Sequence, residues 1–585
     1  MKKRILSSLM ALALCLSLLP TAALAEGTPA EVSAANDLTT ALKGAAAIIK
    51  LIADIEIDTT LTVSREVTLD LNGNVLKMTG PGRVIEVKSG GNLTLTDSTP
   101  SATHSFKVDE STKLWILDKT NGTNTVNGGV ITGGNANAGG DGGGVKIVSG
   151  TFTMTGGNIV GCTAQAGGGV FVGNGDTFKM TDGSIAGCVA NTANGGGVFV
   201  GNGGTFEMTG GSIVGCTAES KNMSGGGICN DGTTKLSGSA KIQDCRASHS
   251  GDGGGIYSWL ELTVNGDVKI TGCKKGETPD AMHLEAGTVS GGTFDGKVTN
   301  KSGTISGGTF SGTVENKDGT IKNGTFKEKV NNVGTIENGE FKGTVDNQAS
   351  GTIGGGMFSG TVENKGGTIK NGTFSGTVKN KKWADKSGTI EGGTFSGTVE
   401  NQTGGTIEGG TFSGTVTNNG TINGGTFAVT FDTKGGSSVP VENVLNGQKA
   451  TKPADPTKTG YTFDGWYTEE AYANLYDFDT SVQNALTLYA KWTINQYTIT
   501  FKPENGDKDT TITQDYGTPV TAPANPTRTG YTFAGWDKEI PATMPAENMT
   551  VTAQWTAVGS GSSGGGSSSS GGGSSSGGSS RSRTP

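Results

Sequence analysis

The stretch GGGVFVGNGDTFKMTDGSIAGCVANTAN, residues 167–194, is followed directly by GGGVFVGNGGTFEMTGGSIVGCTAESKNMS, residues 195–224. Related units begin at residues 142, 225 and 253, so one repeat takes roughly 27 residues. Each unit has short apolar runs separated by glycine-rich turns, and no run is long enough to bury itself. Stacking unit on unit supplies the missing partners, which predicts a parallel β-helix, or β-solenoid, over residues 45–290. One cysteine recurs per unit, at Cys162, Cys188, Cys216, Cys245 and Cys273.

A shorter unit follows over residues 291–427, with a period of roughly 16 residues. Its pattern is seen in GTISGGTFSGTVEN, residues 303–316, where Ile, Phe and Val recur in every copy. This spacing predicts a narrow triangular coil with one inward side chain on each side. Pro279 is the only proline between residues 101 and 439. Proline is expected to be rare where the backbone N–H and C=O groups of each coil are both hydrogen-bonded.

The composition agrees with a thin, continuous core. The 585 residues include 102 glycines, and only 32 % are hydrophobic. Glycine does not recur at every third position, which excludes collagen. Residues 26–44 are predicted to cover the N-terminal end of the solenoid and to include a short helix at 33–43. The side chain of Ser33 or Asn36 is expected to cap the N-terminus of this helix.

Residues 1–25 have the features of a secretory signal peptide: a basic start, a short apolar run and Ala23-Leu24-Ala25 before Glu26. Its removal leaves 42 basic and 53 acidic residues, a net charge of −11. That charge opposes nucleic-acid binding. No later apolar stretch is long enough to span a membrane. We therefore expect an exported protein at the cell surface, in the cell envelope or outside the cell.

Two copies of a different unit occupy residues 428–492 and 496–555. They share PADPTKTGYTFDGWY, residues 453–467, and PANPTRTGYTFAGWD, residues 523–537. Each copy ends in a strand-like run that carries a tryptophan. Residues 556–585 are dominated by glycine and serine, which predicts a disordered tail.

The pair of C-terminal units resembles the internalin B-repeat family, also called Listeria–Bacteroides repeats. The resemblance implies small β-grasp-like modules on a bacterial surface protein, with no catalytic role. The long units resemble the right-handed parallel β-helix family of exported bacterial proteins. The residues that carry the module signature are Gly460, Tyr461, Phe463, Trp466 and Trp492 in the first copy, and Gly530, Tyr531, Phe533, Trp536 and Trp555 in the second.

The cysteine ladder has three interpretations. Its residues would lie ~4.8 Å apart on adjacent coils, a separation that a disulfide tolerates. A buried stack of small apolar side chains is the simplest alternative, and metal binding is a third. Cys229 is off the ladder, at the position of Phe171 and Phe199, and is interpreted as a packing or surface residue. No cofactor or metal is expected, and the calcium-binding β-roll nonapeptide does not recur.

Parallel β-helices include polysaccharide lyases and hydrolases, so an enzymatic function is an alternative for this fold. The candidate catalytic residues are Arg246, His249 and Asp252, which fall close together in the sequence; a solvated loop is the alternative. Asp141 precedes a similar glycine corner about four coils away, and His104 and His283 look isolated.

The sequence thus favours an adhesin or surface-presentation rod that acts by extended contact without catalysis. Ladders of Thr, Ser, Asn and Lys are expected on its exterior, where they would contact glycans, host surfaces or envelope polymers, or simply be solvated. A polysaccharide-active β-helix enzyme and a passive spacer are the alternatives.

Overall fold

The computed structural model describes residues 28–137, 140–221 and 224–559. The predicted signal peptide and most of the Gly/Ser tail lie outside these residues. The fold is all-β, as predicted, with one helix among the described residues, α2 (Ala35–Lys43). The chain forms two compact units. The first runs up to Val429 and includes Glu442–Ala450 and Asp479–Leu486; the second holds the rest of the C-terminal modules.

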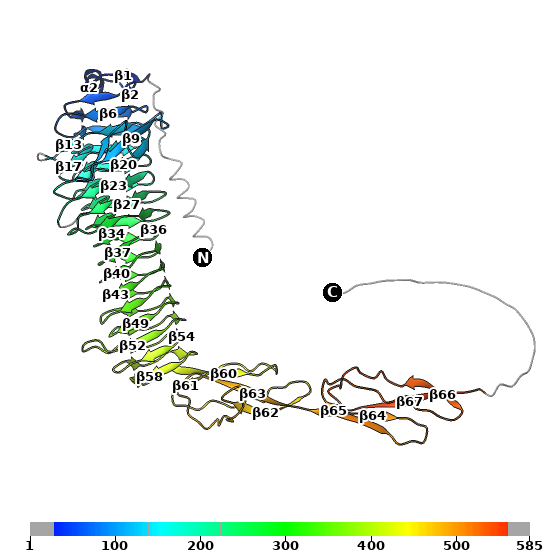
Figure 1. Cartoon of the computed structure of the whole chain (residues 1–585). Coiled ribbons are helices and arrows are strands. Elements are labelled where there is room, and N and C mark those ends of the chain that lie inside the picture. Colours follow the sequence, from blue (N-terminus) through cyan, green and yellow to red (C-terminus); the bar gives the residue numbers. More distant parts are fainter. Residues whose placement is uncertain (1–27, 138–139, 222–223, 560–585) are drawn as a thin grey trace, which may run out of the picture. The chain divides into compact units, whose positions relative to one another are not determined.

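The first unit is a solenoid of stacked coils with three long parallel faces (Figure 1). A representative long coil has four strands, one on each face and a fourth short side. They are β19 (Thr177–Met180), β20 (Ser184–Ala186), β21 (Val189–Ala190) and β22 (Val198–Val200). Each pairs in parallel register with the next coil, so Val198 meets Ile228 and Phe178 meets Phe206. The predicted ladders are therefore confirmed in the long coils.

A short coil keeps three strands and lacks the fourth side. A representative one has β38 (Thr304–Ile305), β39 (Thr309–Phe310) and β40 (Val314–Asn316). Ile305, Phe310 and Val314 are fully buried, which confirms one apolar residue inward per side. The phenylalanines stack with ring centroids 4.7–4.9 Å apart from Phe294 to Phe412.

The Asn at the end of each GTV-x-N unit points inward, and this corrects the expectation of an exposed Asn ladder. Each Asn side chain donates from Nδ2 to the Oδ1 of the next coil at 2.7–2.8 Å. The buried members are Asn300, Asn316, Asn332, Asn347, Asn364, Asn380 and Asn401. Burying an amide is costly unless its donors and acceptors are paired, and the ladder pairs them coil by coil after its first rung, where Asn300 Oδ1 has no partner among the described residues.

The glycine corners of the long coils are required by geometry. Gly195 has φ of +71°, which favours glycine. A Cβ on Gly196 would lie 2.4 Å from the Thr217 carbonyl oxygen, and one on Gly197 would lie 2.6 Å from Ile213 Cγ2. Any larger residue would therefore push adjacent coils apart.

The N-terminal helix begins at Ala35, two residues after its predicted start, and ends at Lys43 as predicted. Its N-cap is Ala34, which makes no side-chain capping bond, so neither Ser33 nor Asn36 caps it. Leu38 and Leu42 are buried toward the first coils, and this packing holds the helix in place of a cap.

An antiparallel three-stranded sheet interrupts the early coils. It consists of β9 (Thr103–Val108), β10 (Trp115–Leu117) and β11 (Asn124–Asn127), and it was expected to be further coil. Phe106 packs with Val130, Val160 and Ala186 of the solenoid, with Trp115 against them. The insertion thus covers part of one solenoid face.

The fourth side of the long coils ends at a hairpin. β33 (Lys274–Lys275) turns back and pairs antiparallel with the start of β34 (Thr278–Leu284), with Lys274 opposite Pro279. Proline lacks the N–H that a further parallel neighbour would need. From here on the coils have three sides.

The second unit contains the repeated modules. The second copy is a four-stranded mixed sheet in the order β65-β64-β67-β66. Its strands are β64 (Gln496–Lys502), β65 (Thr510–Asp515), β66 (Tyr531–Trp536) and β67 (Met549–Ala557). In the first copy β62 (Tyr461–Tyr467) pairs antiparallel with β63 (Leu486–Ile494).

Candidate functional site

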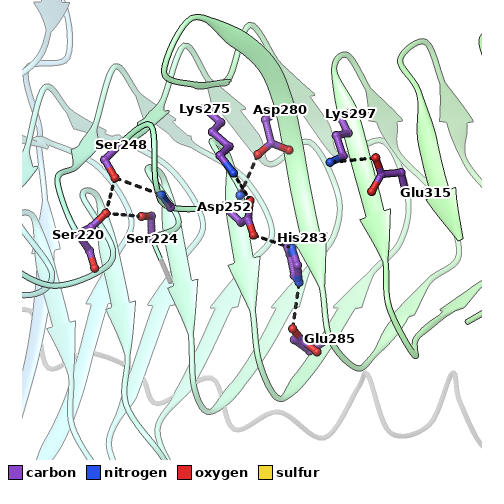
Figure 2. Close-up of polar contacts among 12 residues, drawn as sticks. Ser220, Ser224, Ser248, Asp252, Lys275, Asp280, His283, Glu285, Lys297 and Glu315 are labelled. Carbon is purple, nitrogen blue, oxygen red and sulfur yellow. Dashed lines mark hydrogen bonds and ion pairs between the residues drawn. The ribbon is translucent and has the colours of Figure 1, made fainter. Parts of the chain in front are cut away.

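The predicted catalytic candidates lie on a corner of the last long coils. Arg246 belongs to β29 (Arg246–Ala247), and His249 and Asp252 follow it in the loop before the next glycine corner. The loop is anchored by Ser248, whose hydroxyl donates to the Ser220 carbonyl and accepts from the Gly251 N–H (Figure 2).

The three candidates face different partners. Arg246 Nη2 lies 2.7 Å from Glu277 Oε1. His249 packs beside Gly276, where an added Cβ would lie 2.7 Å from its ring. Asp252 instead contacts Lys275, with Oδ1 2.7 Å from Nζ. The structure therefore places the candidates on one corner without joining them in a single constellation.

His283 is not isolated, contrary to expectation. Its Nδ1 lies 3.5 Å from Asp252 Oδ2, and its Nε2 lies 3.0 Å from Glu285 Oε1 (Figure 2). Its ring stacks on Tyr257, with centroids 4.9 Å apart. Lys301 is the last member of this network of polar contacts, with Nζ 2.8 Å from Glu285 Oε2. The sequence spacing did not reveal this network because its members come from consecutive coils of unequal length.

Two neighbouring carboxyls have opposite pKa displacements. Burial opposes ionisation of Asp252, but Lys275, with help from His283 and Lys297, leaves its pKa below the ordinary value. Asp280 is 5 % exposed, and burial raises its pKa despite the nearby Lys297 and the Gly253 N–H, which donates to Oδ2 at 3.0 Å. Such a divergence is also found in catalytic acid–base pairs.

The contacts of this cluster favour a structural role. Both oxygens of Asp252 face cationic or imidazole groups, and Asp280 is held by backbone. The cluster lies where four-sided coils give way to three-sided ones, so its ion pairs tie the two geometries together. Structural networks of this kind also perturb pKa values. Asp141, at an equivalent corner, pairs with Lys146 at 3.2 Å.

The cysteine ladder consists of buried free thiols. Cys162, Cys188, Cys216, Cys245 and Cys273 are all fully buried, and so is Cys229. From Cys188 onward each ladder thiol donates to an Ile carbonyl of the preceding coil at 3.6–3.7 Å. Burial raises the pKa of Cys216 and Cys245, which keeps these thiols neutral. Cys229 pairs in register with Phe199 and Tyr257, at the expected position.

The module signature builds the same aromatic cluster twice. Phe463 meets Trp466 and Trp492 edge to face, with centroids 5.4 Å apart in both pairs. Phe533 meets Trp536 and Trp555 in the same way at 5.4 and 5.7 Å. In the second copy Trp536 of this cluster packs against a buried core of Ile499, Phe501, Met544 and Val551.

Glycine and tyrosine complete the signature in both copies. Gly460 and Gly530 have φ of +81° and +82° at the turn before the strand. Lys458 lies over the ring of Tyr461 at 4.5 Å, and Arg528 lies over Tyr531 at 4.2 Å. The motif thus fixes a turn and a cation–π contact rather than a cluster of reactive groups.

Among the described residues, no group of three or more His, Cys, Asp or Glu side chains is arranged to hold a metal ion. The helix that the structure describes is too short and too polar to cross a membrane.

Comparison with known proteins adds to this geometry. The Listeria–Bacteroides repeat domain family matches residues 427–491 and 497–554. A "putative membrane protein" and a "putative Gly-rich membrane protein" of Evansella cellulosilytica are 36 % identical over 135 residues and 34 % identical over 134 residues. Internalin H of Listeria monocytogenes is 42 % identical over 116 residues. No solved structure matches this chain.

The segment matched to the putative membrane protein covers 22 % of this chain and 20 % of the relative, and the segment matched to the putative Gly-rich membrane protein covers 21 % and 16 %. The segment matched to internalin H covers 18 % of this chain and 21 % of internalin H. Together with the fold, these matches fit a surface repeat protein. The chain therefore carries two Listeria–Bacteroides repeats, which follow a long parallel β-solenoid in the sequence.

Proposed function

We propose that this protein is an exported adhesin or surface-presentation rod that acts by extended contact and without catalysis. The observation that carries the proposal is the unbroken outer register of the short coils. Threonines recur at one outward position from coil to coil, and all pair in register. They are Thr288, Thr304, Thr320, Thr335, Thr352, Thr368, Thr389, Thr406 and Thr421.

A second face of the same coils carries charge. Lys297 pairs with Glu315 at 3.2 Å, and Asp346 forms ion pairs with Lys365 at 2.8 Å and with Lys329 at 3.7 Å. The interior is closed by Phe, Ile, Val and Asn. A repetitive polar exterior on a closed core supports binding by area rather than by a reactive centre.

The test is a binding screen with the exported chain against glycans, host-matrix proteins and bacterial envelope polymers. A product-release assay on acidic and neutral polysaccharides runs on the same samples. Saturable binding without product supports the proposal. Product release that is lost in Asp252→Ala would replace it with the enzymatic alternative, and neither binding nor product would leave the passive spacer.

A further inference from the structure

Two large apolar residues are exposed at a solenoid corner where most of the long coils have glycine, asparagine or aspartate. Trp259 is 48 % exposed and Leu260 is 40 % exposed. They connect β30 (Ile256–Ser258) to β31 (Glu261–Val264), at the place where the three preceding coils have Gly-Asn-Gly or Asp-Gly and the coil before those has Val148-Ser149, with Val148 also exposed. Nothing in the packing of the coil requires such side chains here, and exposed apolar residues in a polar setting mark binding sites.

The corner changes length at this point and leaves a cavity of about 400 Å³ lined by Asn202, Asp231, Trp259 and Leu260. The corner between β22 and β23 (Thr205–Met208) takes four residues, 201–204. The same corner takes only two residues in each of the next two coils, at 231–232 and 259–260. Asn202 on the longer loop thus forms one wall of the cavity, and Trp259 and Leu260 form the other.

The polar part of the cavity has hydrogen-bonding capacity that the protein does not use. Asp231 Oδ1 is shielded from solvent and has no hydrogen-bond partner among the described residues. Burial alone raises the pKa of this carboxyl. The next carboxylate along the same column, Glu285, is already paired with His283 and Lys301. Asp231 lines the cavity and is half-buried as a whole, so the other oxygen of its carboxylate, Oδ2, is the acceptor that a ligand hydroxyl would reach.

The cavity is pre-organised by a buried network beneath it. Asn230 donates from Nδ2 to Ser258 Oγ at 2.9 Å and accepts from Thr234 Oγ1 at 2.8 Å. The backbone N–H of Trp259 donates to the Asn230 carbonyl at 2.9 Å, and that of Asp231 donates to Val200 at 2.8 Å. A wall fixed in this way loses little entropy on binding.

We propose that this corner, formed by Asn202, Asp231, Trp259 and Leu260, is a binding site for a neutral pyranose residue of a glycan. The apolar face of the sugar ring would lie on the Trp259 indole, and adjacent hydroxyls would donate to Asp231 and exchange hydrogen bonds with the Asn202 amide. A purely apolar peptide group would bury Asp231 without a donor, which disfavours it. This inference deepens the proposed adhesin function and rests on it.

The test is calorimetric titration of the exported chain with cellohexaose, xylohexaose, mannohexaose and chitohexaose. At least one sugar is expected to bind. Trp259→Ala should weaken that binding by more than about tenfold, and Asp231→Ala should weaken it as well. The matched control is Trp383→Ala, since Trp383 is another exposed tryptophan, 56 % exposed, on a loop of the short coils. Unchanged melting temperatures show that the variants remain folded.

Two results would overturn the inference. One is the failure of all four sugars to bind, and the other is equal binding by the Trp259→Ala and Trp383→Ala variants. A parallel assay of adhesion to immobilised envelope polymers and matrix proteins separates the two proposals. If adhesion persists in Trp259→Ala and the sugars do not compete with it, the adhesin function is supported and this binding site is excluded. If the wild type does not adhere to any of the surfaces, both proposals are excluded.

Discussion

At the scale of single residues, the buried asparagines show how a polar group becomes part of a core. Each buried Asn amide in the short coils bonds the next coil, and the first five of them also bond a backbone carbonyl of their own corner, as Asn316 does to Gly319 at 3.0 Å. The side chain thereby links neighbouring coils and fixes the turn that follows it.

Replacing one rung should therefore destabilise the rod locally. Asn332→Ala removes the acceptor of Asn316 and the donor to Asn347, at a cost of about 1–3 kcal/mol for each group left unpaired. Hydrogen exchange measured by mass spectrometry should show faster exchange in the coils that contain these residues. Asn331→Ala, on the outward side of the same strand, is the control, and equal exchange in the two variants would contradict the ladder's role.

A second residue-scale prediction concerns Asp280. Its raised folded-state pKa means that the ionised form is disfavoured in the folded chain. Stability is therefore lost as the pH rises through the unfolded value, near 3.9, toward the folded one. Asp280→Asn keeps an acceptor for the Gly253 N–H and removes the buried charge, so its melting temperature should exceed that of the wild type by a few degrees at pH 7.

The advantage of Asp280→Asn should shrink below pH ~3.9, where the wild-type carboxyl is protonated in both states. Thermal unfolding followed by circular dichroism at several pH values measures this difference. Asp318→Asn, at an exposed position, serves as the control. A lower melting temperature for Asp280→Asn at pH 7 would mean that the attraction of Lys297 outweighs the burial of the carboxyl.

At the scale of elements, the cysteine ladder behaves as one apolar column. Because every ladder thiol is buried, we expect no reaction of the native chain without residues 1–25 with a thiol reagent such as dithionitrobenzoate. In guanidinium all six cysteines of that chain should react without prior reduction. Fewer than six reactive thiols after denaturation would show that disulfides form along the ladder, and a melting temperature lowered by reductant would agree with that result.

The elements also show which parts of the fold could be predicted from the sequence. The Phe, Ile and Val ladders follow from a constant period, because identical positions must stack. The inward Asn was missed because a polar residue beside a glycine turn resembles an exposed corner. The insertion at β9–β11 was missed because its strands alternate like those of a coil, while their antiparallel pairing depends on contacts that no period encodes.

The candidate site was harder to predict than the fold. His283 and Asp252 meet although they are 31 residues apart, and the hairpin at Pro279 decides that distance. The cavity at Trp259 depends on a change in corner length between coils. The exposed Trp-Leu pair in a Gly-Asn-Asp corner was the available signal, and it becomes informative once the corners are aligned.

At the scale of the whole molecule, stacking makes the solenoid modular. Each short coil contacts mainly its two neighbours, so removing one complete coil should leave every ladder continuous. Deletion of residues 334–350 would bring Phe326 against Phe358 and Asn332 against Asn364, with the same residue types in each pair. The shortened chain should therefore fold, with an unchanged circular dichroism spectrum and a melting temperature within a few degrees of the wild type.

Deletion of half a coil, residues 334–342, is the matched control. It would remove one Ile and one Phe but keep the following Val, so the strands after the cut would no longer meet their counterparts on the same faces. Because the ladders carry both the hydrophobic core and the amide pairs, this mismatch should expose the downstream coils to fast hydrogen exchange and to proteolysis. If both deletions behaved alike, the coils would not be independent units, and stability would have to come from contacts that span many coils.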